Sequence, residues 1–127
     1  MPEVDIVLGT KHYVDIVKAI DSLYSDGDFN KEYMDGVGGI DQLMVDRDIS
    51  TSTFAWLKIG EGCMNCCSYC AIPLIRGSFV SRPMEEIIAE AKAIVSKGYT
   101  ELILAAQDTT NYGIDLYGAP KLAELLQ

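Results

Sequence analysis

Residues 54–59 read FAWLKI, and residues 83–106 read PMEEIIAEAKAIVSKGYTELILAA. The first stretch has the apolar and aromatic content that predicts a strand. The second predicts a helix from about Pro83 to Lys97, followed by a short apolar strand over residues 102–106. A strand, a helix and a second strand in this order predict a right-handed βαβ crossover with parallel strands. The chain is therefore expected to be an α/β protein.

The helix carries matching signals at both ends. Pro83 fits the first turn, where its missing N–H does no harm, and Glu85 and Glu86 favour the positive end of the helix dipole. Lys97 favours the negative end, and Gly98 is the expected C-terminal cap. One apolar stripe is predicted to face the sheet: Met84, Ile87, Ile88, Ala91, Ile94 and Val95. The continuously apolar strand that follows is typical of a strand buried on both faces.

Two polar segments follow the two strands. A long loop, residues 60–82, comes after the first strand and holds every cysteine of the chain. Residues 107–110, Gln-Asp-Thr-Thr, come after the second strand. Since ligands of α/β folds lie at the carboxyl ends of parallel strands, we expect both segments to open onto one end of the sheet.

The N-terminal part predicts a separate β-α unit. Residues 5–8 predict a strand, and residues 13–24 predict a helix whose apolar residues recur at helical spacing: Val14, Val17, Ile20, Leu23 and Tyr24. Gly27 suits the end of that helix. Residues 25–52, acidic and glycine-containing, are interpreted as a linker with a short hairpin near Gly38 and Gly39. His12 is expected to have a structural role at or near the surface. A last helix is predicted over residues 121–127.

Composition limits the function classes. The 127 residues carry 19 acids and ten bases, a net charge of −9. Residues 1–50 hold eleven acids and four bases, so most of the excess lies there. A basic face for direct nucleic-acid binding is not visible, and we interpret the acidity as a solvated surface. No apolar run approaches the roughly 20 residues of a membrane span, and the start lacks the regions of a secretory signal. A cytoplasmic protein is expected.

All four cysteines lie within eight residues: Cys63, Cys66, Cys67 and Cys70. A cytoplasmic setting argues against disulfides, and two overlapping C-x2-C pairs fit a redox site poorly. Structural zinc binds four ligands in a tetrahedron. Cys66 and Cys67 fit this geometry poorly, because the side chains of adjacent residues tend to diverge. A four-iron cluster held by three thiolates at the spacing C-x3-C-x2-C would leave one iron open for chemistry. The residues alone leave these four interpretations open.

The motif resembles a known family. C-x3-C-x2-C after the first strand, with Tyr69 before the last cysteine, is similar to the radical S-adenosylmethionine superfamily. The stretch LKIGEGCMNCCSYCAIPLIRGSFVSRPMEEIIAEA resembles the methylthiotransferases, and AAQDTTNYGIDLYGAPKLAELL resembles their RimO type. Residues 74–77 and 107–110 follow that type and not the tRNA-modifying MiaB type. The resemblance is strong over residues 53–127.

The resemblance implies a cofactor set and a reaction. Cys63, Cys67 and Cys70 would ligate a 4Fe–4S cluster, whose open iron would bind S-adenosylmethionine and generate a radical that abstracts hydrogen from an unactivated carbon. Tyr69 would sit beside the adenine, with a packing aromatic as the alternative. Gln107, together with Asp108, stands where the superfamily contacts the methionine moiety, with a polar turn as the alternative. The family installs a methylthio group on an aspartate β-carbon of the twelfth small-subunit ribosomal protein.

The sequence also suggests roles for two arginines and two aromatic residues. Arg76 would meet the ligand's carboxylate or pair with a nearby acid. Arg82 has the same two alternatives, and pairing with nearby acids is favoured because Glu85 and Glu86 are close in sequence. Trp56 and Phe54 are interpreted as barrel core.

Cys66 departs from the resemblance, because the family commonly has a basic residue there. It adds a competing thiol and opens an alternative C-x2-C-x3-C register. We predict that Cys66 is not a ligand.

The resemblance also implies a domain layout. Residues 1–24 would be the last β-α unit of an N-terminal methylthiotransferase domain, residues 25–52 an acidic linker, and residues 53–127 the first βαβ portion of a partial, TIM-like radical SAM barrel. The chain would then be an internal fragment that cannot turn over alone, its electron donor unidentified. Two other functions stay open: a tRNA methylthiotransferase of the MiaB type, and a non-enzymatic fragment that binds zinc or an iron–sulfur cluster.

Overall fold

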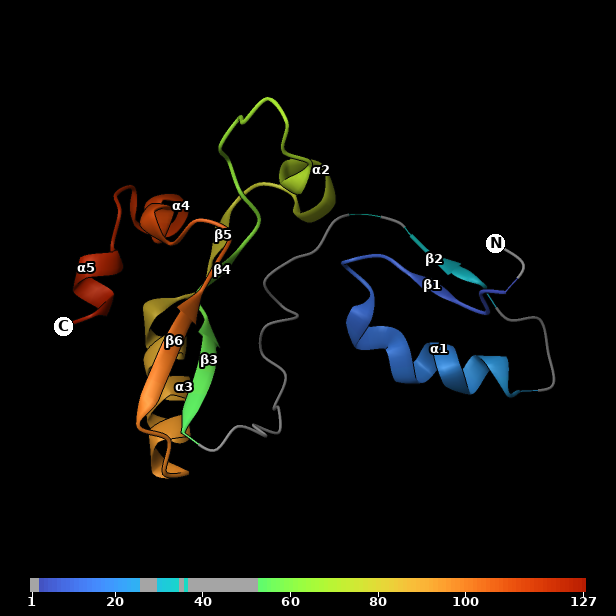
Figure 1. Cartoon of the computed structure of the whole chain (residues 1–127), viewed down its shortest axis with the longest axis horizontal. Coiled ribbons are helices and arrows are strands. Elements are labelled where there is room, and N and C mark those ends of the chain that lie inside the picture. The colour runs from blue at the N-terminus through green and yellow to red at the C-terminus, as the bar shows by residue number, and fades with distance from the viewer. Residues whose placement is uncertain (1–2, 26–29, 35, 37–52) are drawn as a thin grey trace.

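The computed structural model describes residues 3–25, 30–34, 36 and 53–127. Figure 1 shows the described chain in two parts, one built around β1, α1 and β2 and the other running from β3 to the C-terminus. The second part carries all four cysteines.

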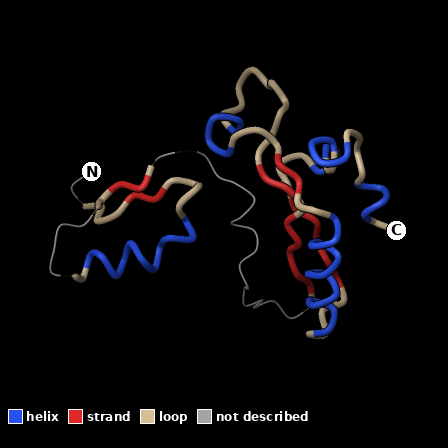
Figure 2. The backbone as a smooth tube through the Cα atoms, turned by 180° about the vertical axis from the view of Figure 1, so that it is seen from behind, coloured by secondary structure: helices blue, strands red, loops and turns tan. Residues whose placement is uncertain are grey.

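The second part is built on the predicted βαβ crossover. Strand β3 (Phe54–Lys58) runs parallel to β6 (Glu101–Ala105), with Phe54 opposite Glu101 and Lys58 opposite Ala105. Helix α3 (Met84–Ser96) connects them and covers one face of the pair, as the opposite views of Figures 1 and 2 agree. The predicted α/β character and the parallel pairing are confirmed.

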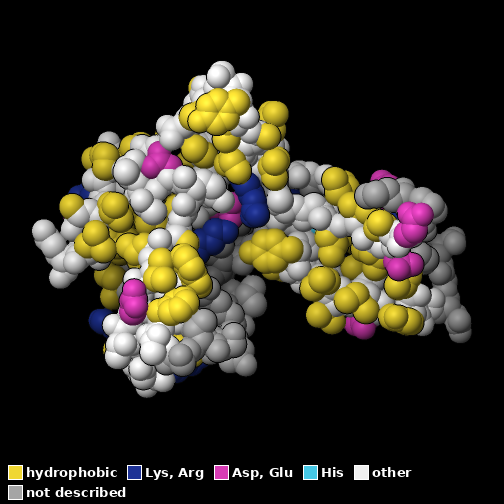
Figure 3. Space-filling view, viewed as in Figure 1, with side chains coloured by type: hydrophobic (Ala, Val, Ile, Leu, Met, Phe, Trp, Pro, Cys, Tyr) yellow, Lys and Arg dark blue, Asp and Glu magenta, His cyan; other side chains and the backbone are white. Residues whose placement is uncertain are grey.

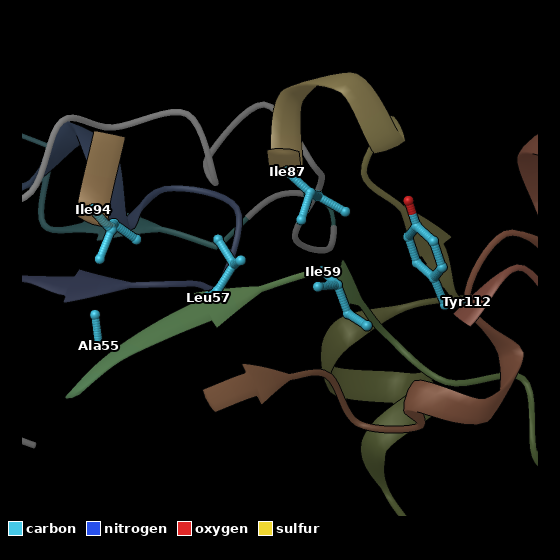
Figure 4. Close-up of a cluster of buried hydrophobic side chains, with 6 residues drawn as sticks. All are labelled: Ala55, Leu57, Ile59, Ile87, Ile94 and Tyr112. Atoms are coloured by element: carbon cyan, nitrogen blue, oxygen red, sulfur yellow. The ribbon is translucent and has the colours of Figure 1, made fainter. Parts of the chain in front are cut away.

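The core lies between β3 and α3. Every second residue along β3 and just after it is at most 2% exposed: Ala55, Leu57 and Ile59. They pack with Ile87 and Ile94 of α3 and with Tyr112 (Figure 4). Because side chains alternate across a strand, every second residue of β3 points toward the helix.

The same alternation turns the two aromatic residues of β3 away from α3. Trp56 and Phe54 lie on the face away from α3, where they contact each other edge to face at 6.2 Å. Trp56 is 52% exposed and Phe54 is half-buried. Neither belongs to the core between β3 and α3. Because the interior of a β/α barrel lies on the face away from the helices, the expectation that these residues are barrel core stays a prediction.

Helix α3 begins and ends where the sequence predicts. Pro83 is its N-cap residue, and Gly98 follows with a φ of +94°, a left-handed conformation that favours glycine. Only part of the predicted stripe is buried. Ile87 and Ile94 are in the core, whereas Ile88 and Val95 are exposed.

Strand β6 is less buried than its sequence predicts. Four of its five residues are half-buried and Glu101 is exposed. The prediction of burial on both faces is wrong for the described residues, because α3 covers only one face of the two-stranded sheet.

The segment predicted as one long loop contains regular structure. Strands β4 (Gly60–Glu61) and β5 (Val80–Ser81) pair antiparallel and close its base. Between them lie the cysteine loop, residues 62–71, and the short helix α2 (Ile72–Arg76). In Figure 1 the cysteine loop projects beyond the end of the sheet.

Short helices follow β6. They are a 3-10 turn, η3 (Thr109–Asn111), and the helices α4 (Ile114–Tyr117) and α5 (Leu122–Leu125). The sequence predicts only the last of these, and α5 is shorter than the predicted range of 121–127. Leu122 and Leu125 pack against the core cluster, so this segment extends the core.

The first part pairs β1 (Val7–Leu8) in parallel with β2 (Glu32–Tyr33). A 3-10 turn, η1 (Tyr13–Asp15), leads into α1 (Ile16–Leu23), so the predicted strand and helix are present but shorter. Strand β2 lies inside the range predicted as a linker. Gly27 and the hairpin predicted near Gly38 and Gly39 lie outside the described residues.

Most of the apolar stripe predicted for residues 13–24 is exposed in η1 and α1. Ala19 is its buried residue, whereas Val14, Val17 and Ile20 are 44%, 66% and 45% exposed. His12 is half-buried, with Nδ1 3.0 Å from Asp15 Oδ2, as expected for a structural histidine. Within the described ranges, no helix combines the length and the apolar character that a bilayer crossing requires.

Replacing Leu57 by Ala tests the core. Leu57 is 2% exposed between β3 and α3, so the substitution is expected to lower the free energy of unfolding by about 2–5 kcal/mol. Val95→Ala on α3 is the control, because Val95 is 56% exposed, and it is expected to change stability by less than about 0.5 kcal/mol. Urea unfolding followed by circular dichroism measures both, and equal losses would contradict this assignment of the core.

Candidate functional site at the cysteine loop

The carboxyl ends of β3 and β6 bring the two polar segments together. Gln107 Nε2 donates a hydrogen bond to Glu61 Oε1 at 2.9 Å. Asn65 Nδ2, inside the cysteine loop, donates to Asp108 Oδ2 at 2.7 Å. The expectation that both segments open onto one end of the sheet is confirmed by these two contacts.

The base of the cysteine loop is tightly closed. Gly62 has a φ of +77°, and a Cβ added there would lie 2.3 Å from the carbonyl oxygen of Ser78. The N–H of Cys63 donates to the carbonyl of Gly77 at 3.2 Å. Only glycine fits at position 62, and this close approach fixes the entry of the loop against its exit.

All four thiols are free. Cys63 is 8% exposed, Cys70 is half-buried, and Cys66 and Cys67 are exposed. The N–H of Cys70 donates to the carbonyl of Cys67 at 3.1 Å, which forms a turn between these two residues. The Sγ of Cys66 lies 3.9 Å from the carbonyl oxygen of Met64. The loop therefore offers four unoxidised thiols on a short, mostly exposed segment.

The donor set suits a soft metal centre. Thiolates are the preferred ligands of iron–sulfur clusters and of zinc. In the part of the chain that the structure describes, no three His, Cys, Asp or Glu side chains stand together as a metal-binding group. Metal binding and local folding are coupled in such sites, so thiols that are apart without the metal do not exclude a centre here. The residues fit such a centre by their chemistry and spacing.

Glu61 is the buried charge of the site. Its side chain is 5% exposed and forms ion pairs with Lys58 and, at 3.5 Å, with Arg76 Nη1. Burial alone would raise the pKa of this carboxyl. The hydrogen bond and charge of Lys58 and the charge of Arg76 outweigh burial and hold the pKa below its ordinary value. Glu61 is therefore ionised near neutral pH. Figure 3 shows Lys and Arg side chains gathered beside an acidic side chain at the centre of this face.

Asp108 organises the opposite side of the site. It is the N-cap of η3, and it accepts hydrogen bonds from the Thr110 N–H at 3.0 Å and the Thr110 hydroxyl at 2.6 Å. Asn111 Nδ2 donates to it at 2.7 Å, as Asn65 does. The hydrogen bonds from Thr110 and Asn65 lower the pKa of Asp108.

The structure places the other predicted residues individually. Tyr69 is 92% exposed, so the alternative of a packing aromatic is wrong for the described chain. Gln107 is exposed at the strand end and bonded to Glu61. Arg76 pairs with an acid, Glu61.

Arg82 is also paired with an acid of the following helix. It is 2% exposed, and its Nη1 lies 2.5 Å from Glu90 Oε2 and donates to the carbonyl of Lys58 at 2.8 Å. The expected pairing of Arg82 with a nearby acid is confirmed, and the acid that the structure gives is Glu90. Glu85 is exposed at the start of α3, and Glu86 lies in the same turn, whereas Glu90 stands one turn further along the helix.

Sequence reasoning missed two residues of the site, Glu61 and Asn65. An acid directly before the Gly-Cys pair is a weak signal, because a carboxylate in a predicted loop is typically solvated. Only the β4–β5 pairing buries Glu61. Asn65 lies inside the cysteine motif, and its contact with Asp108 spans 43 residues of sequence.

Comparison with known proteins gives the class. The radical SAM superfamily matches residues 57–126, which include the cysteine loop, Glu61 and the segment after β6. The chain belongs to this superfamily. Membership implies, in general, S-adenosylmethionine and a 4Fe–4S cluster.

Relatives match the whole chain. Proteins named "Ribosomal protein uS12 methylthiotransferase RimO" from Acetivibrio thermocellus and Desulforamulus reducens are 48% and 46% identical over 100% of it. The protein of that name from Geobacter sulfurreducens is 44% identical, also over 100% of this chain. The chain spans 29%, 29% and 28% of the lengths of these three relatives.

Acidification is expected to release the contact between Asp108 and Asn65. Folding lowers the pKa of Asp108, so this carboxylate stabilises the fold above its unfolded pKa of about 3.9, and the contribution is lost as pH falls through the lower, folded pKa. The Asn65 side-chain amide resonances should stay constant above about pH 5 and shift below about pH 4. In Asp108→Asn the shift should be absent. A pH-independent Asn65 amide in the unsubstituted chain would contradict the contact.

Proposed function

We propose that this chain supplies the cluster-binding and S-adenosylmethionine-binding part of a radical SAM methylthiotransferase that modifies ribosomal protein uS12. The observation that carries the proposal is the identity of 43–48% over the whole chain with relatives that bear this name. The geometry supports it, because the cysteine loop and the segment after β6 meet at one end of a parallel sheet.

The cysteine loop is proposed to hold a 4Fe–4S cluster through Cys63, Cys67 and Cys70. When bound, such a cluster supplies the electron that splits S-adenosylmethionine and so starts radical chemistry at an unactivated carbon. The protein's part is to hold three thiolates and to leave the fourth iron for the ligand. Cys63 is already anchored at the closed base of the loop, and Cys67 and Cys70 share a turn.

Two further side chains are proposed to bind S-adenosylmethionine. Tyr69 is fully available for stacking on the adenine, because it is 92% exposed next to Cys70. Gln107 stands at the end of β6, facing the loop, and is proposed to contact the methionine moiety. Arg76 is held by Glu61, so the proposal gives it no contact with the ligand.

The proposed substrate is taken from the relatives' names, and the proposed location from the sequence. A ribosomal-protein substrate suits the cytoplasmic location that the sequence predicts, and the net charge of −9 does not favour direct binding of RNA by this chain. The domain layout proposed with it assigns residues 1–24, 25–52 and 53–127 to a β-α unit, a linker and the first part of a radical SAM barrel.

Serine substitutions test the ligand set. After anaerobic reconstitution, the unsubstituted chain is expected to hold about four iron atoms. Cys63→Ser, Cys67→Ser and Cys70→Ser should each lose most of this iron, because each removes one of three thiolate ligands. Cys66→Ser is the matched control within the same loop and should retain it. Iron analysis and the visible absorption measure all four, and tight binding of zinc with no iron would favour a structural-zinc site. A loss of iron in Cys66→Ser as complete as in Cys67→Ser would show that the ligand register is wrong.

The substrate is tested by mass spectrometry. Protein that contains this chain, reconstituted and supplied with S-adenosylmethionine, a reductant and sulfide as the sulfur source, is incubated with ribosomal protein uS12 or with tRNA. We expect a mass increase of one methylthio group on an aspartate of uS12 and no change in the tRNA. Modification of tRNA alone would assign the chain to the tRNA-modifying branch of the family. The 127-residue chain by itself is expected to be inactive.

A further inference from the structure

Glu61 has no role in the proposed function, yet it is the most constrained charge of the site. The residue is 4% exposed at the end of β4, two positions before Cys63. A buried carboxylate is costly unless its oxygens are paired and hydrogen-bonded. The ion-pair and hydrogen-bond partners of the Glu61 carboxylate therefore show which segments it connects.

The partners come from three different segments. Lys58 is the last residue of β3, and Arg76 is the last residue of α2. Gln107 follows β6, and its Nε2 donates to Glu61 Oε1 at 2.9 Å. The N–H of Gly62 lies 3.3 Å from the same oxygen. One carboxylate thus connects the entry and the exit of the cysteine loop with the end of the neighbouring strand.

The bond to Gln107 also fixes the orientation of that side chain. A carboxylate only accepts hydrogen bonds, so the amide must turn its NH₂ group toward Glu61. The amide oxygen of Gln107 then lies on the other side of the planar group and remains an acceptor for a ligand. Since Gln107 is otherwise exposed, this bond is the restraint on its side chain that the structure shows.

We propose that Glu61 is a positioning residue for the S-adenosylmethionine site: it fixes the side-chain amide of Gln107 relative to the cysteine loop. The proposal rests on the proposed function, in which Gln107 contacts the ligand. Lys58 and Arg76 hold the carboxylate in place, and the carboxylate holds Gln107. Glu61 itself does not touch the ligand.

Shortening the side chain tests the proposal while keeping the charge. Glu61→Asp withdraws the carboxylate from Gln107 by one methylene group, and Gln107→Ala removes the proposed contact. Glu90→Asp is the matched control, because Glu90 also pairs with an arginine, Arg82, but from helix α3. These three single variants and the double variant at positions 61 and 107 are compared with the unsubstituted, reconstituted full chain.

Affinity for S-adenosylmethionine, measured by equilibrium dialysis, is the first readout. Glu61→Asp and Gln107→Ala are each expected to weaken binding about tenfold, the size expected for one lost charge-assisted or ligand hydrogen bond. The double variant should bind as weakly as Gln107→Ala alone, because Glu61 acts through Gln107. Glu90→Asp should bind normally, and all variants should retain their iron.

The second readout needs no cofactor. In the unsubstituted chain without iron, the side-chain amide protons of Gln107 should exchange with solvent more slowly than those of an exposed glutamine, as seen by nuclear magnetic resonance. Glu61→Asp should abolish this protection, and Glu90→Asp should leave it unchanged. A positioning role predicts this signature, whereas a role in overall stability does not.

Several results would overturn the proposal. The first is a normal affinity of Glu61→Asp for S-adenosylmethionine. The second is a double variant whose loss of affinity is the product of the two single losses. The third is a Gln107 side-chain amide that exchanges as fast as an exposed one in the unsubstituted chain. Loss of iron or of the fold in Glu61→Asp would instead make Glu61 a structural residue of the loop. If the unsubstituted chain binds iron but no S-adenosylmethionine, the proposed function itself is wrong, and this inference falls with it.

Discussion

The parallel pairing of β3 with β6 is the constraint on which the rest of the site depends. Because both strands run the same way, their carboxyl ends meet at one edge of the sheet, and the segments that follow them must share that edge. The burial of Leu57 and Ile87 between sheet and helix holds this arrangement. The contacts of Glu61 with Gln107 and of Asn65 with Asp108 then link the two segments directly.

The parts of the fold that local sequence patterns encode could be predicted from the sequence. The period of the apolar residues and the Pro83 and Gly98 signals define α3 to within a residue or two at each end. The apolar runs define β3 and β6, and the crossover rule then dictates that they are parallel. The meeting of the two polar segments follows from that topology. The cysteine spacing, its position after β3 and the neighbouring Tyr69 carry the resemblance to the superfamily whose match covers residues 57–126.

Features that depend on contacts between distant segments could not be predicted. Burial of Glu61 requires the β4–β5 pairing, and both strands are only two residues long, too short for a sequence period. Which face of β3 Trp56 occupies follows from the side chains that α3 covers, and the described structure leaves Trp56 half-exposed on the other face. Arg82 pairs with Glu90, an acid eight residues further along the chain. In each case the tertiary arrangement supplies what the residue type alone does not.

The most direct test of the central claim is the electron paramagnetic resonance spectrum of the anaerobically reconstituted, reduced chain, recorded with and without S-adenosylmethionine. An open iron on three thiolates of the cysteine loop predicts a four-iron signal that shifts when the ligand is added, because the ligand then coordinates that iron. A four-iron signal that is unchanged by S-adenosylmethionine would contradict the account, since the loop would then hold a cluster that presents no open iron to the ligand.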